Sequence, residues 1–290
     1  MNPALPLIIL SSVLTALLLP VLYDGVERKI KARLQGRIGP PVHQTLLDLR
    51  KLLSKETVEF PCRHLVLYAT STTIVLELAV TVLLNLVLAG LYVEVLIPVA
   101  VALIAAIQAA SVSASFLTPN PYSQIGGRRE AALAAVNETA LITGLVLYYY
   151  ELLNPSRGHW LAVISILALV AIAAYVSSGR TPFDVSEAEV ELASGVLVEL
   201  SGRVLALQLY SIYLKRYIAS MLPAAIVLLS LQAPGAVRLL AGYASTLAFW
   251  VLYSTTSVFS GRSRVDLTLR LLPKIYLPLI LLAVIEMVAT

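Results

Sequence analysis

The segment LVLYATSTTIVLELAVTVLLNLVLA (Leu65–Ala89) contains one charged side chain, Glu77, in an otherwise apolar and Thr-rich run. About 20 apolar residues in a helix cross the roughly 30 Å hydrocarbon core of a bilayer, so this segment is long enough to span a membrane. Similar blocks recur along the chain: Pro3–Leu22, Val95–Phe116, Ala131–Tyr150, Trp160–Val176, Val204–Leu231, Val237–Phe259 and Leu271–Ala289. They lack the period-2 alternation of a membrane barrel, which indicates helices.

The overall composition agrees with the apolar blocks. Hydrophobic residues make up 59% of the 290 residues, charged residues 13%, and the mean hydropathy is +0.86. Soluble proteins contain about 25% charged residues. We therefore predict an all-α polytopic membrane protein of about eight transmembrane helices, with residues 1–290 forming one integral membrane domain. The first block has neither a preceding basic residue nor a small-residue cleavage site, so we do not expect a secretory signal there.

Basic residues predict the orientation. With eight spans, most of the 21 Lys and Arg residues fall in the odd-numbered loops, and nine of them lie in the first loop. The positive-inside rule then places these loops in the cytoplasm and both termini outside the plasma membrane. Membrane topology thus explains the net charge of +4, and no nucleic-acid partner is expected.

Metal and nucleophile chemistry find little support in the sequence. Cys62 is the only cysteine, and His43, His64 and His159 are scattered. No metal-ligand spacing, phosphate-binding Gly-rich loop or nucleophile elbow is present. We therefore expect no catalytic residue, metal or cofactor in this chain, so any redox centre would lie in a partner subunit. The low content of Asn, Gln, Cys and Met is typical of a thermophilic source.

The first cytoplasmic loop, residues 23–64, divides into two parts. Residues 23–37 are predicted to extend the first helix as a basic shaft, which Gly39-Pro40-Pro41 then ends. A leucine stripe follows at helical spacing, which predicts a helix lying in the membrane interface. Its members are Leu46, Leu49, Leu52 and Leu53. Such a helix is either a membrane-surface helix with snorkelling lysines or one wall of a cavity beneath a partner.

The second notable loop, residues 177–203, contains RTPFDVSEAEVELASGVLVELSG (Arg180–Gly202) and is acidic. Its carboxylates are Asp184, Glu187, Glu189, Glu191 and Glu199. Pro182 suits a turn or the first turn of a helix capped by Asp184 or Ser186. On such a helix Glu187 and Glu191 share a face, which local stability does not explain because like charges four residues apart repel. The loop is therefore either a solvated acidic segment or the lining of a hydrated pocket.

Three further carboxylates fall within the apolar blocks. Glu138 and Glu77 lie deep in their blocks, whereas Glu286 lies near the outer end of the last one, where an interfacial position is expected. A carboxylate in hydrocarbon must be paired, hydrated or protonated. Glu138 is accordingly either a proton-exchanging group or a structural partner of Lys215 or Arg216, the two cations within the sixth block.

Several segments together resemble one family. They are Glu27-Arg28-Lys29 with Arg37-Ile38-Gly39-Pro40, Arg129 to Glu138, Pro182-Phe183-Asp184 through Gly202, and Arg262-Ser263-Arg264-Val265-Asp266 with Lys274 and Pro278. Their order on eight spans resembles that in the membrane subunit of energy-converting membrane-bound NiFe hydrogenases. That subunit is homologous to the membrane subunit of the NADH-quinone oxidoreductases that forms the floor of the quinone cavity in complex I.

The resemblance implies a coupling function. In this family the acidic loop and the intramembrane glutamates form a hydrated passage between a redox arm and antiporter-like membrane subunits. The pathway carboxylates it suggests are Glu138, Glu187, Glu189, Glu191, Glu199, Asp184 and, from its position alone, Glu77. Residues expected as counter-charges or docking groups are Arg28, Arg37, Arg180, Arg262, Arg264, Asp266, Lys215 and Arg216. Hydrophilic hydrogenase-like large and small subunits on the cytoplasmic face would carry the iron–sulfur clusters and a NiFe centre.

Three departures from the complex I pattern favour the hydrogenase or sulfur-reducing branch over a quinone reductase. Pro41-Val42-His43-Gln44 follows Gly39-Pro40, Asn137 precedes Glu138, and the glutamate expected near Ile212 is absent. A quinone-cavity subunit remains the alternative. A stand-alone ion-coupled transporter using Glu77 and Glu138 would predict inverted repeats, and the acidic loop has no counterpart in the first half. A purely structural anchor would leave Glu138 unexplained.

Overall fold

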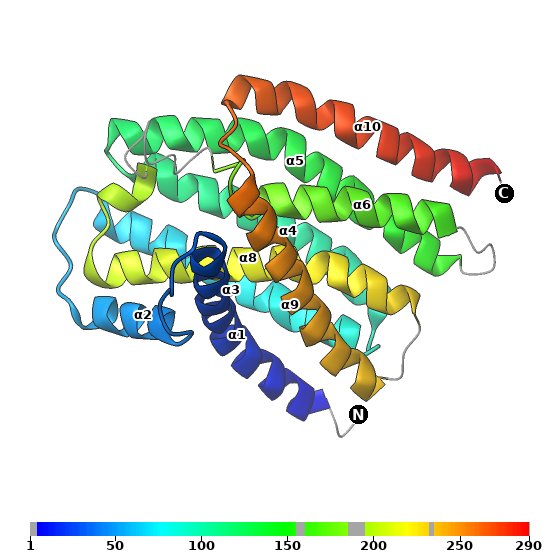
Figure 1. Ribbon diagram of the computed structural model, residues 1–290, viewed down its shortest axis with the longest axis horizontal. Coiled ribbons are helices and arrows are strands. Elements are labelled where there is room, and N and C mark those ends of the chain that lie inside the picture. The colour runs from blue at the N-terminus through cyan, green and yellow to red at the C-terminus, as the bar shows by residue number, and fades with distance from the viewer. Residues whose placement is uncertain (1–4, 155–159, 185–194, 232–234, 290) are drawn as a thin grey trace.

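The structure is a computed structural model that describes residues 5–154, 160–184, 195–231 and 235–289. The described residues form helices and connecting loops without strands, which confirms the predicted all-α class (Figure 1). The elements are α1 (Leu5–Leu34), α2 (Gln44–Ser54), α3 (Arg63–Leu88), α4 (Val93–Leu117), α5 (Pro121–Leu153), α6 (Trp160–Ser177), the 3₁₀ helix η2 (Gly195–Val198), α8 (Gly202–Ser230), α9 (Gly235–Phe259) and α10 (Val265–Ala289).

Seven of the described helices are long and apolar enough to cross a membrane, namely α1, α3, α4, α5, α6, α8 and α10. The helix α9 has 25 residues, the same length as α4 and α10. Hydroxyl-bearing residues such as Ser254, Thr255, Thr256 and Ser257 dilute its apolar character. The eighth crossing therefore stays a prediction.

The helix α8 lies at the centre of the bundle, where it packs against α3, α6 and α9 (Figure 1). In its most apolar stretch 78% of the residues are buried, compared with 17% in α4 and 22% in α10. Polar residues on α8 are thus shielded by protein, while α4 and α10 present apolar side chains such as Val99 and Leu281 outward. This arrangement allows α8 to carry charged residues through a membrane-spanning bundle.

Both helical segments predicted in the first loop are present, whereas the interfacial position of the second stays a prediction. The helix α1 continues to Leu34, and α2 lies at the end of the bundle opposite to the two chain ends (Figure 1). The loop packs closely on α1, because a Cβ added at Gly25 would lie 1.8 Å from the backbone oxygen of Val42. Leu49 of α2 is buried with Tyr213 of α8, while Leu46 and Leu53 are exposed.

The start of the acidic loop is a turn, as Pro182 predicts. The backbone N–H of Phe183 donates to the carbonyl of Arg180, and the N–H and hydroxyl of Ser263 both bond to the carbonyl of Pro182. Residues 185–194, including Glu187, Glu189 and Glu191, lie outside the described residues.

Candidate functional site: a charged cluster around Lys215

Lys215, near the middle of α8, forms an ion pair with a carboxylate of α5. Its Nζ lies 3.3 Å from Oε1 of Glu130. From α4, the side chains of Gln108 and Ser111 each donate to the same oxygen at 3.5 Å. The sequence reasoning assigned Lys215 as a counter-charge but missed Glu130. The position of Glu130 eight residues before Glu138 could have indicated its role, because residues eight apart lie on one stripe of a helix.

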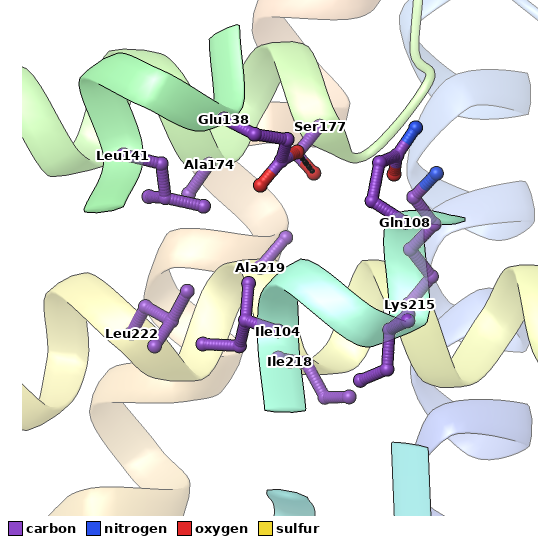
Figure 2. Close-up of a pocket in the computed structure, with 11 residues that line it drawn as sticks. Ile104, Gln108, Glu138, Leu141, Ala174, Ser177, Lys215, Ile218, Ala219 and Leu222 are labelled. Atoms are coloured by element: carbon purple, nitrogen blue, oxygen red, sulfur yellow. Dashed lines mark hydrogen bonds between the residues drawn. The ribbon is translucent and has the colours of Figure 1, made fainter. Parts of the chain in front are cut away.

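Glu138 faces the same region from α5. Its Oε1 accepts a hydrogen bond of 2.9 Å from the hydroxyl of Ser177, at the end of α6. Figure 2 shows Glu138 and Ser177 on one wall of a cavity, with Lys215 beside Gln108 across from them. Oε2 of Glu138 has no hydrogen-bond partner among the described residues. The direct ionic partner of Lys215 is thus Glu130, while Glu138 lines the cavity that Lys215 also lines.

Three adjoining cavities surround Lys215. Lys215 and Ser177 line all three of them. The largest is rich in polar side chains, which are Ser111, Ser115, Glu130, Ser177, Ser178, Gln208, Ser211, Lys215 and Arg216. A polar cavity with this many hydrogen-bonding side chains can hold ordered water that satisfies buried polar groups. The cluster is therefore suited to proton exchange.

The cavity at Glu138 is polar at one end and apolar at the other. Along α4, α5 and α8, the positions of Ile104, Leu141 and Leu222 lie farther from the α2 end of the bundle than Gln108, Glu138 and Lys215 do. The offsets are three to seven residues, or about 4 to 10 Å along a helix axis. Ile104 and Leu222 also line the next cavity, where Tyr148 carries the only polar side chain among the described lining residues. The polar cavities thus end at an apolar layer.

Glu77 joins the cluster from α3. Its side chain is fully buried, with 0% exposure, and its Oε1 accepts a hydrogen bond of 3.0 Å from the hydroxyl of Ser211. Oε2 has no partner among the described residues. Ser211 lies one helical turn before Lys215 on α8 and lines the largest cavity. Glu77 therefore contacts the wall of that cavity through one hydroxyl.

A second charged cluster lies between α1 and the start of the acidic loop. Arg180 donates from Nη2 to Oε2 of Glu27 at 2.7 Å, and Lys31 contacts the other oxygen of Glu27 at 2.7 Å. The Arg180 guanidinium lies 4.6 Å from the ring centroid of Trp250. Burial lowers the pKa of Arg180 from its ordinary value, and Glu27 opposes that fall.

The neighbouring pair in α1 links the second cluster to α8. Asp24 contacts Nε of Arg28 at 2.9 Å, accepts from Thr45 at 2.8 Å, and lies 4.0 Å from Nη1 of Arg216. Lys215 and Arg216 are consecutive, so the two clusters meet on α8. Sequence reasoning did not assign a site role to Asp24 or Glu27. The four-residue spacings Asp24–Arg28 and Glu27–Lys31 were the available signal.

Other predicted carboxylates are placed apart from Lys215. Asp184 pairs with Nη2 of Arg262 at 3.3 Å, joining the acidic loop to the segment before α10. Glu199 accepts a hydrogen bond of 2.9 Å from Asn120. Glu286 accepts from the backbone N–H of Leu161 at 3.2 Å.

The predicted counter-charges divide between buried and exposed positions. Arg28 pairs with Asp24 and Asp48 within the first loop region, rather than with the acidic loop. Arg37 is exposed and bonds to Gln35. Arg264 and Asp266 are exposed at the start of α10. Among the predicted cations, Arg28, Arg180 and Arg216 contact the buried carboxylates of Asp24 and Glu27, and Lys215 contacts the partly buried Glu130.

Together, the membrane-length helices and the buried charges at mid-helix define a helical membrane protein with a charged, cavity-lined interior. The model of the NADH dehydrogenase family matches residues 7–288, and the chain belongs to this family.

Relatives of known name are subunits of several complexes. The chain is 28% identical to hydrogenase-4 component C of Escherichia coli over 231 residues, covering 73% of this chain and 72% of the relative. It is 29% identical to formate hydrogenlyase subunit 4 of the same organism, covering 68% and 69%. It is 30% identical to a subunit of the NADH-quinone oxidoreductase of Anoxybacillus flavithermus, covering 61% and 59%.

A solved structure shares the fold. A chain of the membrane-bound sulfane sulfur reductase, described as an archaeal respiratory membrane complex, superimposes with a TM-score of 0.74. The match covers 98% of this chain and 99% of that one at 19% identity, so it concerns the fold alone.

Proposed function

We propose that this chain is the membrane anchor and coupling subunit of a multisubunit respiratory complex of the hydrogenase or sulfur-reducing type. Its place is the plasma membrane, with both termini outside. Hydrophilic subunits carrying iron–sulfur clusters and a NiFe centre dock on the cytoplasmic face, and antiporter-like membrane subunits lie alongside. The similarity to a hydrogenase-4 component and a formate hydrogenlyase subunit supports this assignment.

The observation that carries the proposal is the position of Lys215. It lies at mid-helix in the most buried helix, pairs with Glu130, and shares contiguous cavities with Glu138. Glu77 adds a third carboxylate through Ser211. One ammonium cannot compensate three ionised carboxylates away from bulk water, so their protonation states depend on one another. A charge that arrives at one member is transmitted to the rest.

The second cluster provides the connection to the cytoplasmic face. Arg180 begins the acidic loop and pairs with Glu27, and Asp184 a few residues later pairs with Arg262. Arg216 contacts Asp24 and neighbours Lys215 in the chain. A redox event in a docked subunit changes the field at the loop. Arg180, Glu27 and Arg216 transmit that change to Lys215, because Coulomb interactions are stronger in a low-dielectric interior.

The decisive variant is Glu138→Gln in the intact complex, reconstituted in vesicles. We expect ion translocation to be lost while electron transfer by the hydrophilic subunits and assembly persist. Glu94→Gln, which alters an exposed carboxylate at the start of α4, serves as the matched control and should pump normally. Normal translocation in Glu138→Gln would remove Glu138 from the pathway and contradict the proposal.

The reaction branch is tested separately. The native complex is purified and its turnover of hydrogen, polysulfide and quinone is measured. Hydrogen or polysulfide turnover supports the proposal, whereas exclusive quinone reduction would assign the chain to the quinone-cavity alternative.

A further inference from the structure

We propose that Glu77 and Ser211 form a buried proton-binding site, a side branch of the Lys215 cluster that takes protons from the largest cavity through the Ser211 hydroxyl. The role of this site in coupling rests on the proposed function. The site itself stands on the contacts of α3 with α8.

The environment of the Glu77 carboxyl group favours its protonated form. Glu77 is fully buried in the middle of α3, and of its two oxygens only Oε1 has a hydrogen-bond partner among the described residues. A buried carboxylate needs several donors or a direct cation to remain ionised. With one hydroxyl donor, the protonated form is the resting form.

Protons in the largest cavity reach Glu77 through Ser211. Ser211 bonds to Glu77 and also lines the polar cavity, so its hydroxyl bridges the carboxyl group and the cavity. A serine hydroxyl both donates and accepts hydrogen bonds. When a hydrated proton in the cavity binds Ser211 Oγ, the original hydroxyl proton passes to ionised Glu77 Oε1. One proton enters, the serine is regenerated and no other bond changes; release is the reverse.

The contacts of Glu77 suit a proton and not a metal ion. A hard metal cation requires several oxygen ligands at once. The described contacts of the Glu77 carboxyl provide only the Ser211 hydroxyl, which is too few for a metal ion and sufficient for a proton.

The charge of Glu77 affects the ion pair between Lys215 and Glu130. The titratable groups that act on Glu77 from the packed helices are Lys215 and Tyr210, both on α8. Lys215 is one turn from Ser211 and is paired with Glu130. Ionisation of Glu77 attracts the Lys215 ammonium and weakens its hold on Glu130, whereas protonation of Glu77 restores it. The site thereby sets how strongly Lys215 binds Glu130 of α5.

The test is pH-exchange difference infrared spectroscopy on the purified complex, which detects protonated carboxyl groups without relying on turnover. The wild type should show a carboxylic C=O band that Glu77→Gln removes. In Ser211→Ala the band should shift and its hydrogen–deuterium exchange should slow by at least about tenfold, since a positioned proton-transfer group is lost. Ser211→Thr retains the hydroxyl and should restore exchange.

The matched control is Ser220→Ala, which removes another buried serine of α8 whose hydroxyl bonds within its own helix, to the carbonyl of Arg216. Its band and exchange rate should equal those of the wild type. An unchanged spectrum in Glu77→Gln, or wild-type exchange in Ser211→Ala, would overturn the inference. If the spectra behave as expected but Glu138→Gln translocates ions normally, the proton site stands and the coupling function fails.

Discussion

Glu27 and Arg180 form a buried ion pair of 2.7 Å that joins α1 to the start of the acidic loop. Each residue is 2% exposed, and the guanidinium also stacks over Trp250 of α9. Three segments that are distant in the sequence thus meet at one cation. The pair holds the base of the acidic loop against the bundle, whatever position the rest of the loop takes.

Removal of one partner should be costly. Glu27→Ala leaves the Arg180 charge buried with its main partner gone, a loss of about 3–5 kcal/mol in the free energy of unfolding. The thermal denaturation midpoint of the purified complex measures the effect, and Glu59→Ala, at an exposed carboxylate, is the control. Arg180→Lys should also lower the stability, because lysine lacks the planar fork that bonds to a carboxylate and stacks on an aromatic ring. Equal midpoints for Glu27→Ala and Glu59→Ala would contradict this role.

Lys215 should be required for its charge and not only for its volume. Lys215→Met keeps an unbranched apolar chain but leaves Glu130 without its ammonium partner, so ion translocation should be lost. Lys215→Arg should retain part of the translocation. The ratio of ions moved to electrons transferred, measured in vesicles, distinguishes the two variants. A normal ratio in Lys215→Met would show that the pairing with Glu130 is only structural.

The apolar layer beyond Glu138 should act as a seal. Leu222→Asn places a polar group between the polar cavities and the apolar cavity, so water can enter and the passive proton permeability of resting vesicles should rise. Leu222→Met conserves the apolar character and should leave permeability unchanged. Leu281→Asn, at an exposed position of α10, controls for a polar group elsewhere in a span. A tight Leu222→Asn vesicle would place the seal elsewhere.

Gly25 should tolerate no side chain. Its added Cβ would overlap the carbonyl oxygen of Val42, and a backbone group cannot swing aside as a flexible side chain can. Gly25→Ala should therefore displace the loop from α1 and lower the free energy of unfolding by about 1–3 kcal/mol. Gly261→Ala is the control, since nothing lies within 4 Å of its added Cβ and its backbone is not in the left-handed region. Proteolysis of the loop in both variants measures the displacement.

The apolar blocks predicted the helices because membrane length is a local property of the sequence. The bounds were less accurate: α5 begins at Pro121, ten residues before the predicted block, because its first turns carry polar residues such as Arg128 and Arg129. Sequence also predicted Lys215 as a counter-charge. It did not reveal Glu130 as its partner, because the pairing depends on how α5 packs near α8. The same limit applies to Asp24 and Arg216, which are distant in sequence.

Lys215 and Arg216 are successive residues, and successive side chains point about 100° apart around a helix axis. One therefore contacts Glu130 and the other approaches Asp24, on different sides of α8. A small rotation of α8 about its own axis would change both contacts at once. The two charged clusters are consequently linked through α8, and its rotation cannot rearrange one cluster without moving a charged residue of the other.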